Sequence, residues 1–284
     1  TADTLVKISN DFADGNYTME YSHRWLPETD NNGNIFITIR CLDVIDSIMG
    51  HPTNHIYNSP GNADTDFILL KLDSNLNFEW LVNHYQVLGQ AIDEIGNVYQ
   101  KIRISNPNVT YLKKFSPSGQ IIYTYNLGNE GSYGLAVDDT SVYVSNNNGS
   151  INQLDRNTGY LQATWPLSHT GSNHIIDIKI NTLGDIYVNY LAYTAGYDRY
   201  RLEKLNINTP SGGSYIEGRT YGSDWRFCFY NNKIFVLQNE GLEEKNFLCS
   251  YDYNFNLIKM FSTKNLTSVN KICISIFNYE YQIH

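Results

Sequence analysis

The chain is built from a repeated unit of short β-runs and polar turns that recurs six times along its 284 residues. Each copy begins with a turn and a β-run that carries an aromatic residue, as in GNIFI (Gly33–Ile37) and GDIYV (Gly184–Val188). The repeated aromatics are Phe36, Tyr99, Tyr143, Tyr187, Phe235 and Tyr281, at steps of 63, 44, 44, 48 and 46 residues. A repeat of about 40–50 residues with four short strands per copy is typical of a β-propeller blade. The sequence therefore predicts an all-β propeller.

The sixth copy of the repeat is split between the two ends of the chain. Lys271–His284 supplies a hairpin, which corresponds to the two inner strands of a blade, and Thr4–Tyr21 supplies two further strands. The step from Tyr281 through the two ends to Phe36 is 39 residues, close to one period. Joining the ends in one sheet would leave no free edge. We therefore predict a single domain, residues 1–284, with six four-stranded blades and a last blade closed by N- and C-terminal strands.

One insertion interrupts the repeat. The 63-residue step from Phe36 to Tyr99 exceeds its neighbours, and the surplus lies in Cys41–Asp66, between the second and third strands of the first full blade. In a propeller that loop leaves on the same face as the loops joining successive blades, so the insertion is expected over the mouth of the central channel. Long loops are often functional, but a tolerated surface excursion is the alternative.

Composition restricts the classes of partner. The net charge is −9, charged residues make up 17% of the chain, and Lys and Arg form no cluster, so a nucleic-acid partner is not expected. No apolar run approaches the ~18 residues needed to span a bilayer, so membrane insertion is not expected either. The chain opens TADTLVK, without a charged and then apolar leader, which predicts that any signal peptide has been removed or was never included.

Candidate metal ligands have simpler structural interpretations. The four cysteines, at 41, 228, 249 and 273, fit no zinc spacing, and those in strand patterns are predicted to be buried free thiols. DSNLN (Asp73–Asn77) and DYNFN (Asp252–Asn256) start like calcium loops but lack the later Gly and Glu, so β-turns are favoured. His51 and His55 could bind zinc only if a helix brought them together, which Pro52 opposes. No metal and no cofactor are predicted.

No catalytic signature is present, neither a nucleophile elbow nor a P-loop, a zinc-protease motif or a dinucleotide fingerprint. Alignment of the inner strands places Asp177 and Arg226 on adjacent blades near the channel mouth. Acid–base chemistry needs two titratable groups in one pocket, and these two could meet. We predict a structural ion pair between them rather than catalysis.

Aromatic residues are the more suggestive group. Tyr193 and Tyr197 lie in the tyrosine-rich run YLAYTAGYDRY, in the loop of the fourth blade that corresponds to the insertion. The residues predicted to form a flat binding patch on the channel-mouth face are Trp25, Tyr133, Tyr193, Tyr197 and Trp225. Such rings suit sugars or protein surfaces, although packing between blades would also use many of them. The opposite face is expected to carry only short polar turns such as DDTS and SPSG.

The motifs TDNNGNIFITI and DFILLKLDSNLNFEW resemble bacterial SBBP-type propeller repeats, and DEIGNVYQ with YLKKFSPSGQIIYTY also looks like NHL-type repeats. The resemblance covers about half the chain, because the later blades keep the spacing of the repeat but not the residue types of its motifs. It implies a propeller used for binding, often extracellular. An extracellular, cell-surface or virion location is therefore expected.

Three classes of function are compatible with this sequence. The first is a non-catalytic binding module for a glycan or a protein surface. The second is a structural or adhesion component of a larger cell-surface or phage assembly. The third is an enzyme of the six-bladed lyase or lactonase kind, which would need several metal-binding side chains in the channel. The aligned mouth positions are mostly apolar or Gly, which disfavours the third class.

Overall fold

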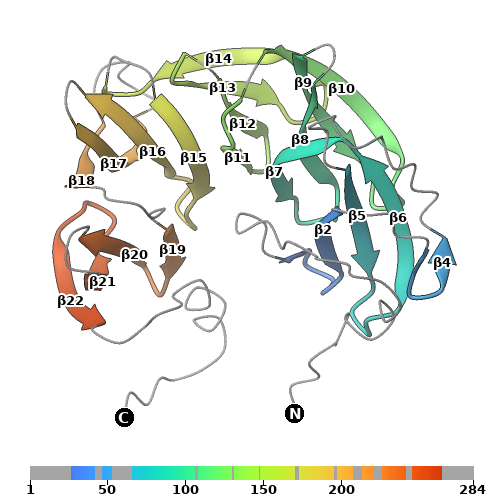
Figure 1. Ribbon diagram of the computed structural model, residues 1–284, viewed down its shortest axis with the longest axis horizontal. Helices are drawn as coiled ribbons and strands as arrows, with labels where there is room; N and C mark the ends of the chain where they lie inside the picture. Colours follow the sequence, from blue (N-terminus) through green and yellow to red (C-terminus); the bar gives the residue numbers. More distant parts are fainter. Residues whose placement is uncertain are drawn as a thin grey trace. The chain divides into compact units, whose positions relative to one another are not determined.

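The computed structural model describes residues 27–41, 47–52, 66–105, 108–129, 131–146, 148–169, 173–194, 197–206, 213–219, 226–240 and 245–263 (Figure 1). The chain divides into two compact units, Thr1–Glu130 and Gly131–His284, and each is described by itself. In the part of the chain that is described, no helix is long and apolar enough to cross a membrane. The predicted split blade, Thr4–Tyr21 with Lys271–His284, lies outside the described residues.

The first unit contains two antiparallel sheets of four strands, each ordered as in the chain. Sheet 1 consists of β1 (Glu28–Thr29), β2 (Ile35–Cys41), β5 (Asp66–Leu72) and β6 (Phe78–His84). Sheet 2 consists of β7 (Gln86–Ile92), β8 (Val98–Ser105), β9 (Asn108–Phe115) and β10 (Ile121–Gly128). A separate short hairpin, β3 (Ser47–Ile48) with β4 (His51–Pro52), lies within the insertion.

The described part of the second unit contains three more four-stranded antiparallel sheets. Sheet 3 consists of β11 (Leu135–Val137), β12 (Ser141–Ser145), β13 (Ser150–Asp155) and β14 (Leu161–Pro166). Sheet 4 consists of β15 (Asn173–Ile180), β16 (Ile186–Thr194), β17 (Tyr197–Lys204) and β18 (Tyr215–Arg219). Sheet 5 consists of β19 (Arg226–Tyr230), β20 (Lys233–Glu240), β21 (Lys245–Tyr251) and β22 (Leu257–Thr263).

These five sheets are consistent with propeller blades, and the inner hairpins expected from the sequence are confirmed for these five sheets, while the sixth, in Lys271–His284, lies outside the described residues. In every sheet the first strand joins the second, and the third joins the fourth, at one end, which we call the turn end. The second strand joins the third at the opposite end, which we call the loop end.

Side chains of the first turn residue fix the turn ends. The carboxylate of Asp93 accepts hydrogen bonds from the backbone N–H of Ile95 and Asn97, at 3.2 and 2.8 Å, and from Asn97 Nδ2 at 2.7 Å. Asp73 and Asp252 make the same set of contacts with the Asn residues that follow them. DSNLN and DYNFN are therefore turns, as predicted, and hydrogen bonds from Asn77 and Asn256 lower the pKa of the two aspartates.

The repeated aromatic stands near the turn end of the second strand, and its ring packs beside a lysine of the third strand in three sheets. Phe36, Tyr99 and Tyr187 are fully buried. The lysine ammonium groups lie 5.4, 5.2 and 5.8 Å from the ring centroids, for Lys71 over Phe36, Lys114 over Tyr99 and Lys204 over Tyr187. A cation over an aromatic face is attractive, and the lysine stem adds apolar contact.

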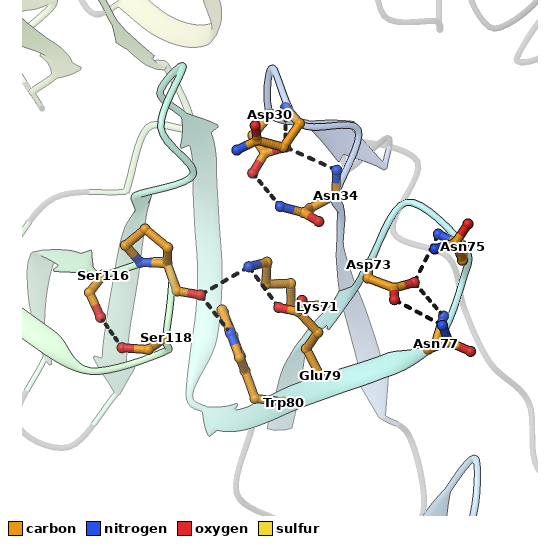
Figure 2. Close-up of polar contacts among 12 residues, drawn as sticks. Asp30, Asn34, Lys71, Asp73, Asn75, Asn77, Glu79, Trp80, Ser116 and Ser118 are labelled. Carbon is orange, nitrogen blue, oxygen red and sulfur yellow. Dashed lines mark hydrogen bonds and ion pairs between the residues drawn. The ribbon is translucent and has the colours of Figure 1, made fainter.

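Neighbouring sheets within each unit pack face to face. Phe36 and Phe67 of sheet 1 share a core with Val98 and Phe115 of sheet 2. Corresponding cores join sheet 3 to sheet 4 and sheet 4 to sheet 5. Figure 2 shows how the sheet 1 side chains Lys71 and Trp80 point to the turn of sheet 2 that carries Ser116 and Ser118. The neighbouring sheets of a unit thus present their turn ends on the same side.

The described part of the insertion lies elsewhere than expected. The insertion leaves sheet 1 at the loop end, but the ring of His51 stacks on Phe78 at the turn end, with centroids 3.7 Å apart and planes at 8°. Ile48 is buried in a cluster with Ile37 and Ile68 on the face of sheet 1 opposite sheet 2. The expectation that this segment covers the channel mouth is therefore wrong for residues 47–52, because Ile48 and His51 find apolar partners along the sheet.

The two cysteines whose side chains are described, Cys228 of β19 and Cys249 of β21, are buried thiols. They lie on opposite faces of sheet 5, because Cys228 pairs with Phe235 and Cys249 pairs with the next residue of β20, Val236. The interpretation of these two cysteines as buried thiols is confirmed.

Candidate functional site

The loop end of sheets 3 and 4 carries two of the predicted binding residues. Tyr133 precedes β11, and its backbone N–H donates to Ile175 O of β15 at 2.9 Å. Gly134 allows this close approach, since a Cβ there would lie 2.7 Å from Ile178 Cγ1. The ring of Tyr133 meets that of His174 edge to face, with centroids 5.1 Å apart and planes at 77°.

Tyr193 lies on the same end of sheet 4. In the β15–β16 register His174 pairs with Leu191, so Tyr193 stands two residues further along β16, about 7 Å at the usual strand rise. Its side chain is 46% exposed. Its carbonyl oxygen lies 3.4 Å from Nε2 of His169. We call Tyr133, His169, His174 and Tyr193 the tyrosine–histidine cluster.

A buried carboxylate holds the connection that carries His169. Glu203 of β17 is almost completely buried and accepts the backbone N–H of Ser168 at 3.0 Å and the Ser168 hydroxyl at 2.7 Å. Tyr190 also donates its hydroxyl to Glu203, at 2.7 Å. Burial, and then the adjacent Glu203 charge, raise the pKa of Tyr190, so its phenol keeps the proton that it donates. Unsatisfied buried carboxylates are costly, and these bonds fix the segment entering sheet 4.

A second charged network stiffens the outer half of sheet 4. Glu217 of β18 accepts hydrogen bonds from Arg199 and Arg201 of β17. Burial alone would raise the pKa of Glu217, but the two guanidinium groups lower it below its usual value. The Arg201 guanidinium also lies over the ring of Tyr215, 4.5 Å from its centroid. These side-chain contacts therefore link β17 to β18 in the sheet that carries His174 and Tyr193.

The structure gives a partial view of the other predicted binding residues. Tyr197 begins β17 and pairs with Thr194 across the β16–β17 hairpin, which puts it one register position from Tyr193. Its side chain lies outside the described residues. Trp25 and Trp225 also lie outside the described residues. Of the five predicted positions, Tyr133, Tyr193 and the backbone of Tyr197 are thus placed at the loop end of sheets 3 and 4.

The predicted Asp177–Arg226 ion pair stays a prediction. Asp177 lies in β15 and Arg226 begins β19, so the two belong to the first strands of successive sheets. Asp177 Oδ2 lies 3.5 Å from Nζ of Lys179, on the same strand. The Arg226 side chain lies outside the described residues.

Sequence reasoning missed two features of the surface. His169 and His174 were not singled out, although they flank the connection that enters β15, and their closeness to the tyrosines depends on strand register. The turn ends are also less polar than expected, because Tyr160 and Leu183 are 74% and 72% exposed in turns of sheets 3 and 4. Among the side chains that the structure describes, no group of three or more His, Cys, Asp and Glu residues could hold a metal ion.

Comparisons with known proteins add little to the strand pattern. No family model matches the chain, and no curated protein matches its sequence. Among solved structures, the crystal structure of BamB from Moraxella catarrhalis resembles it with a TM-score of 0.39 and 11% identity, over 69% of this chain and 80% of that one. The sheets expected from the SBBP-type and NHL-type resemblance are present, while the assignment as blades rests on the five sheets themselves.

Proposed function

We propose that the chain is a non-catalytic binding module that recognises a glycan or a protein surface at the loop end of sheets 3 and 4. The observation that supports this most directly is the exposed ring of Tyr193 within the tyrosine–histidine cluster. Tyrosine and imidazole rings offer apolar area with polar atoms at the edge, which suits both sugar rings and protein side chains. The bonds of Glu203 hold the underlying backbone in place before a ligand arrives, which reduces the ordering cost of binding.

The test begins with a glycan array and a screen of candidate protein partners, followed by titration calorimetry on each hit. Replacing Tyr193 and Tyr197 together by Ala is expected to weaken binding by ~2 kcal/mol or more, since aromatic anchors dominate most interfaces. Tyr160→Ala is the matched control, because Tyr160 is also an exposed tyrosine but lies at the turn end. A ligand whose affinity ignores the double change and falls with Tyr160→Ala would contradict the proposal.

A second candidate function is supported by the outer strands. Leu257, Ile258 and Met260 are each about half exposed on β22, an outermost strand of its sheet. Exposed apolar groups that gather on one strand favour contact with another protein. A component of a larger cell-surface or phage assembly would use such a surface. Replacing Ile258 by Lys should then reduce incorporation into the assembly while Tyr193→Ala leaves it unchanged.

We further propose six blades, with Thr4–Tyr21 and Lys271–His284 in one sheet. The split repeat supports this, and so does the apolar face of sheet 1 that carries Ile37, Ile39 and Ile68 opposite sheet 2. Such a face is stable only when it is covered. Removing the last ten residues should abolish the cooperative thermal transition, and a truncated chain that melts like the parent would exclude this closure. An extracellular, cell-surface or virion location is proposed on the repeat resemblance alone.

A further inference from the structure

Three polar side chains meet beside the apolar core between sheets 1 and 2. Thr38 of β2 donates its hydroxyl to Gln90 Oε1, and Gln100 Nε2 donates to both Thr38 Oγ1 and Gln90 Oε1, at 3.1 Å each. All three residues are buried. The surrounding core contains Phe36 and Val98. We call Thr38, Gln90 and Gln100 the amide triad.

The amide triad leaves one donor group and one acceptor unsatisfied. Gln90 Nε2 and Gln100 Oε1 are closed off from solvent and have no hydrogen-bond partner among the residues that the structure describes. A buried amide atom without a partner carries its full desolvation cost, and native proteins rarely leave such atoms unpaired. Two orphans in one contact therefore require an explanation.

Rotating the glutamine amides by 180° does not remove the two unpaired atoms. Turning Gln90 alone would place two NH₂ groups against each other, and turning Gln100 alone would oppose two carbonyl oxygens. Turning both restores the bond between them but leaves Gln90 Oε1 and Gln100 Nε2 unpaired instead. Every permitted assignment therefore leaves one donor and one acceptor at the outer atoms of the two amides.

We propose that the amide triad binds a buried, ordered water molecule between sheets 1 and 2. A single ligand that satisfies both atoms must both donate and accept, because one free atom is a donor and the other an acceptor in either assignment. It must also be small, because neither atom is reachable from solvent. Water meets both conditions, and buried waters in proteins typically satisfy such groups with about three hydrogen bonds. This site is independent of the binding surface proposed above.

The direct test is a crystal structure of the full chain at about 1.8 Å or better. A density peak within hydrogen-bond distance of both glutamine amides is the expected result. Clear density for Thr38, Gln90 and Gln100 with no peak between or beside the amides would overturn the proposal.

A solution test counts long-lived internal waters by oxygen-17 relaxation dispersion. The Gln90→Met, Gln100→Met double variant is expected to lose one long-lived water relative to the parent chain. Gln153→Met is the matched control, because the amide of Gln153 is satisfied by Ser141 and Trp165 and should leave the count unchanged. Equal counts in the parent and in the double variant would reject the site.

Discussion

At two junctions between neighbouring sheets, sheet 1 with sheet 2 and sheet 4 with sheet 5, different side chains donate hydrogen bonds to an equivalent backbone carbonyl oxygen. In each, the five-residue turn between the third and fourth strands of the later sheet presents the carbonyl of its second residue, Pro117 or Tyr253, to the earlier sheet. Tyr187 donates its hydroxyl to Tyr253 O at 2.9 Å. Trp80 Nε1 and Lys71 Nζ donate to Pro117 O at 2.9 and 3.1 Å (Figure 2).

The difference follows from one hydroxyl. Tyr187 and Phe36 occupy the same position of the repeat, but Phe36 has no hydroxyl to reach the turn. Sheet 1 therefore uses donors from its third and fourth strands, and Lys71 is held in place by an ion pair with Glu79 at 2.7 Å. In sheet 4 the corresponding lysine, Lys204, instead pairs with Asp185 at 2.7 Å.

The residue at the fourth position also differs between the two turns, because a different aromatic side chain of the earlier sheet lies beside it. Both backbones have positive φ there, 80° at Gly119 and 66° at Phe255. A Cβ at Gly119 would lie 3.1 Å from the Trp80 ring, so a side chain there would fit only if the indole shifted by a few tenths of an ångström. Phe255 instead fills the space with a ring edge to face with Tyr187, at 5.7 Å. The repeat thus preserves the position of the turn carbonyl and of a side-chain donor to it, while the residue types at these positions change.

The largest effect is expected from removing the shared aromatic. Tyr187→Ala and Phe36→Ala should each lower the free energy of unfolding by ~3–5 kcal/mol, because each deletes a large, fully buried ring. Urea denaturation of the full chain, followed by circular dichroism, measures both. Losses of similar size would show that the two residues have equivalent roles, and a loss below ~1 kcal/mol at either position would contradict the equivalence.

The sequence was sufficient for those parts of the fold that depend on neighbouring residues. The turn formed by Asp93 and Asn97 closes within five residues, and its hydrogen bonds follow from the turn preference of Asp, Gly and Asn. The apolar alternation in GLAVDDTSVYVS, on either side of a tight polar turn, likewise predicts a hairpin, and Leu135 pairs with Val144 in it.

Contacts between sheets could not be read in the same way. Lys71 donates to Pro117 O, which lies 46 residues later in the chain, and no sequence pattern near Lys71 predicts that contact. The stacking of His51 on Phe78 likewise depends on where the insertion lies against the sheet. The same limit applies to the candidate site, because the contact between His169 and Tyr193 O depends on how the connection entering sheet 4 is anchored by Glu203.

A smaller effect should separate space from backbone strain at the turns. Gly119→Ala is expected to cost ~2 kcal/mol, because the alanine backbone must keep a positive φ and its methyl group also meets the Trp80 ring. Gly184→Ala is the matched control, since its φ is 82° but a Cβ there meets nothing within 4 Å, so strain alone should cost ~1 kcal/mol. Thermal unfolding of both variants gives the comparison. Equal losses would mean that Trp80 does not exclude a side chain at Gly119.

The hydrogen-bond donors themselves should differ in importance. Tyr187→Phe removes the hydroxyl that bonds Tyr253 O and is expected to cost ~1 kcal/mol. Lys71→Met should cost less than ~0.5 kcal/mol, because Trp80 still donates to Pro117 O, the methionine keeps the buried apolar stem, and Glu79, whose side chain is 37% exposed, can be hydrated once the ammonium group is removed. Urea midpoints at equal m-values measure the two changes. A larger loss for Lys71→Met would show that Trp80 does not substitute for the ammonium group.

The smallest effect distinguishes the junctions by pH. Burial, followed by the nearby Asp185, raises the pKa of Tyr187 above its ordinary value. The folded chain then holds this proton more tightly than the unfolded chain, so the contribution of Tyr187 to stability is complete below the unfolded pKa of about 10 and is lost as pH rises through the folded pKa.

Phe36 has no titratable hydroxyl, so at this position of the repeat only the junction of sheets 4 and 5 should weaken in alkali. Near pH 10.5 we expect the parent to lose about 0.5 kcal/mol more than Tyr187→Phe, after allowance for solvent screening. Parallel urea titrations of the two proteins from pH 8 to pH 11 would show the curves converging, and curves that stay parallel would mean that Tyr187 does not contribute to the alkaline loss.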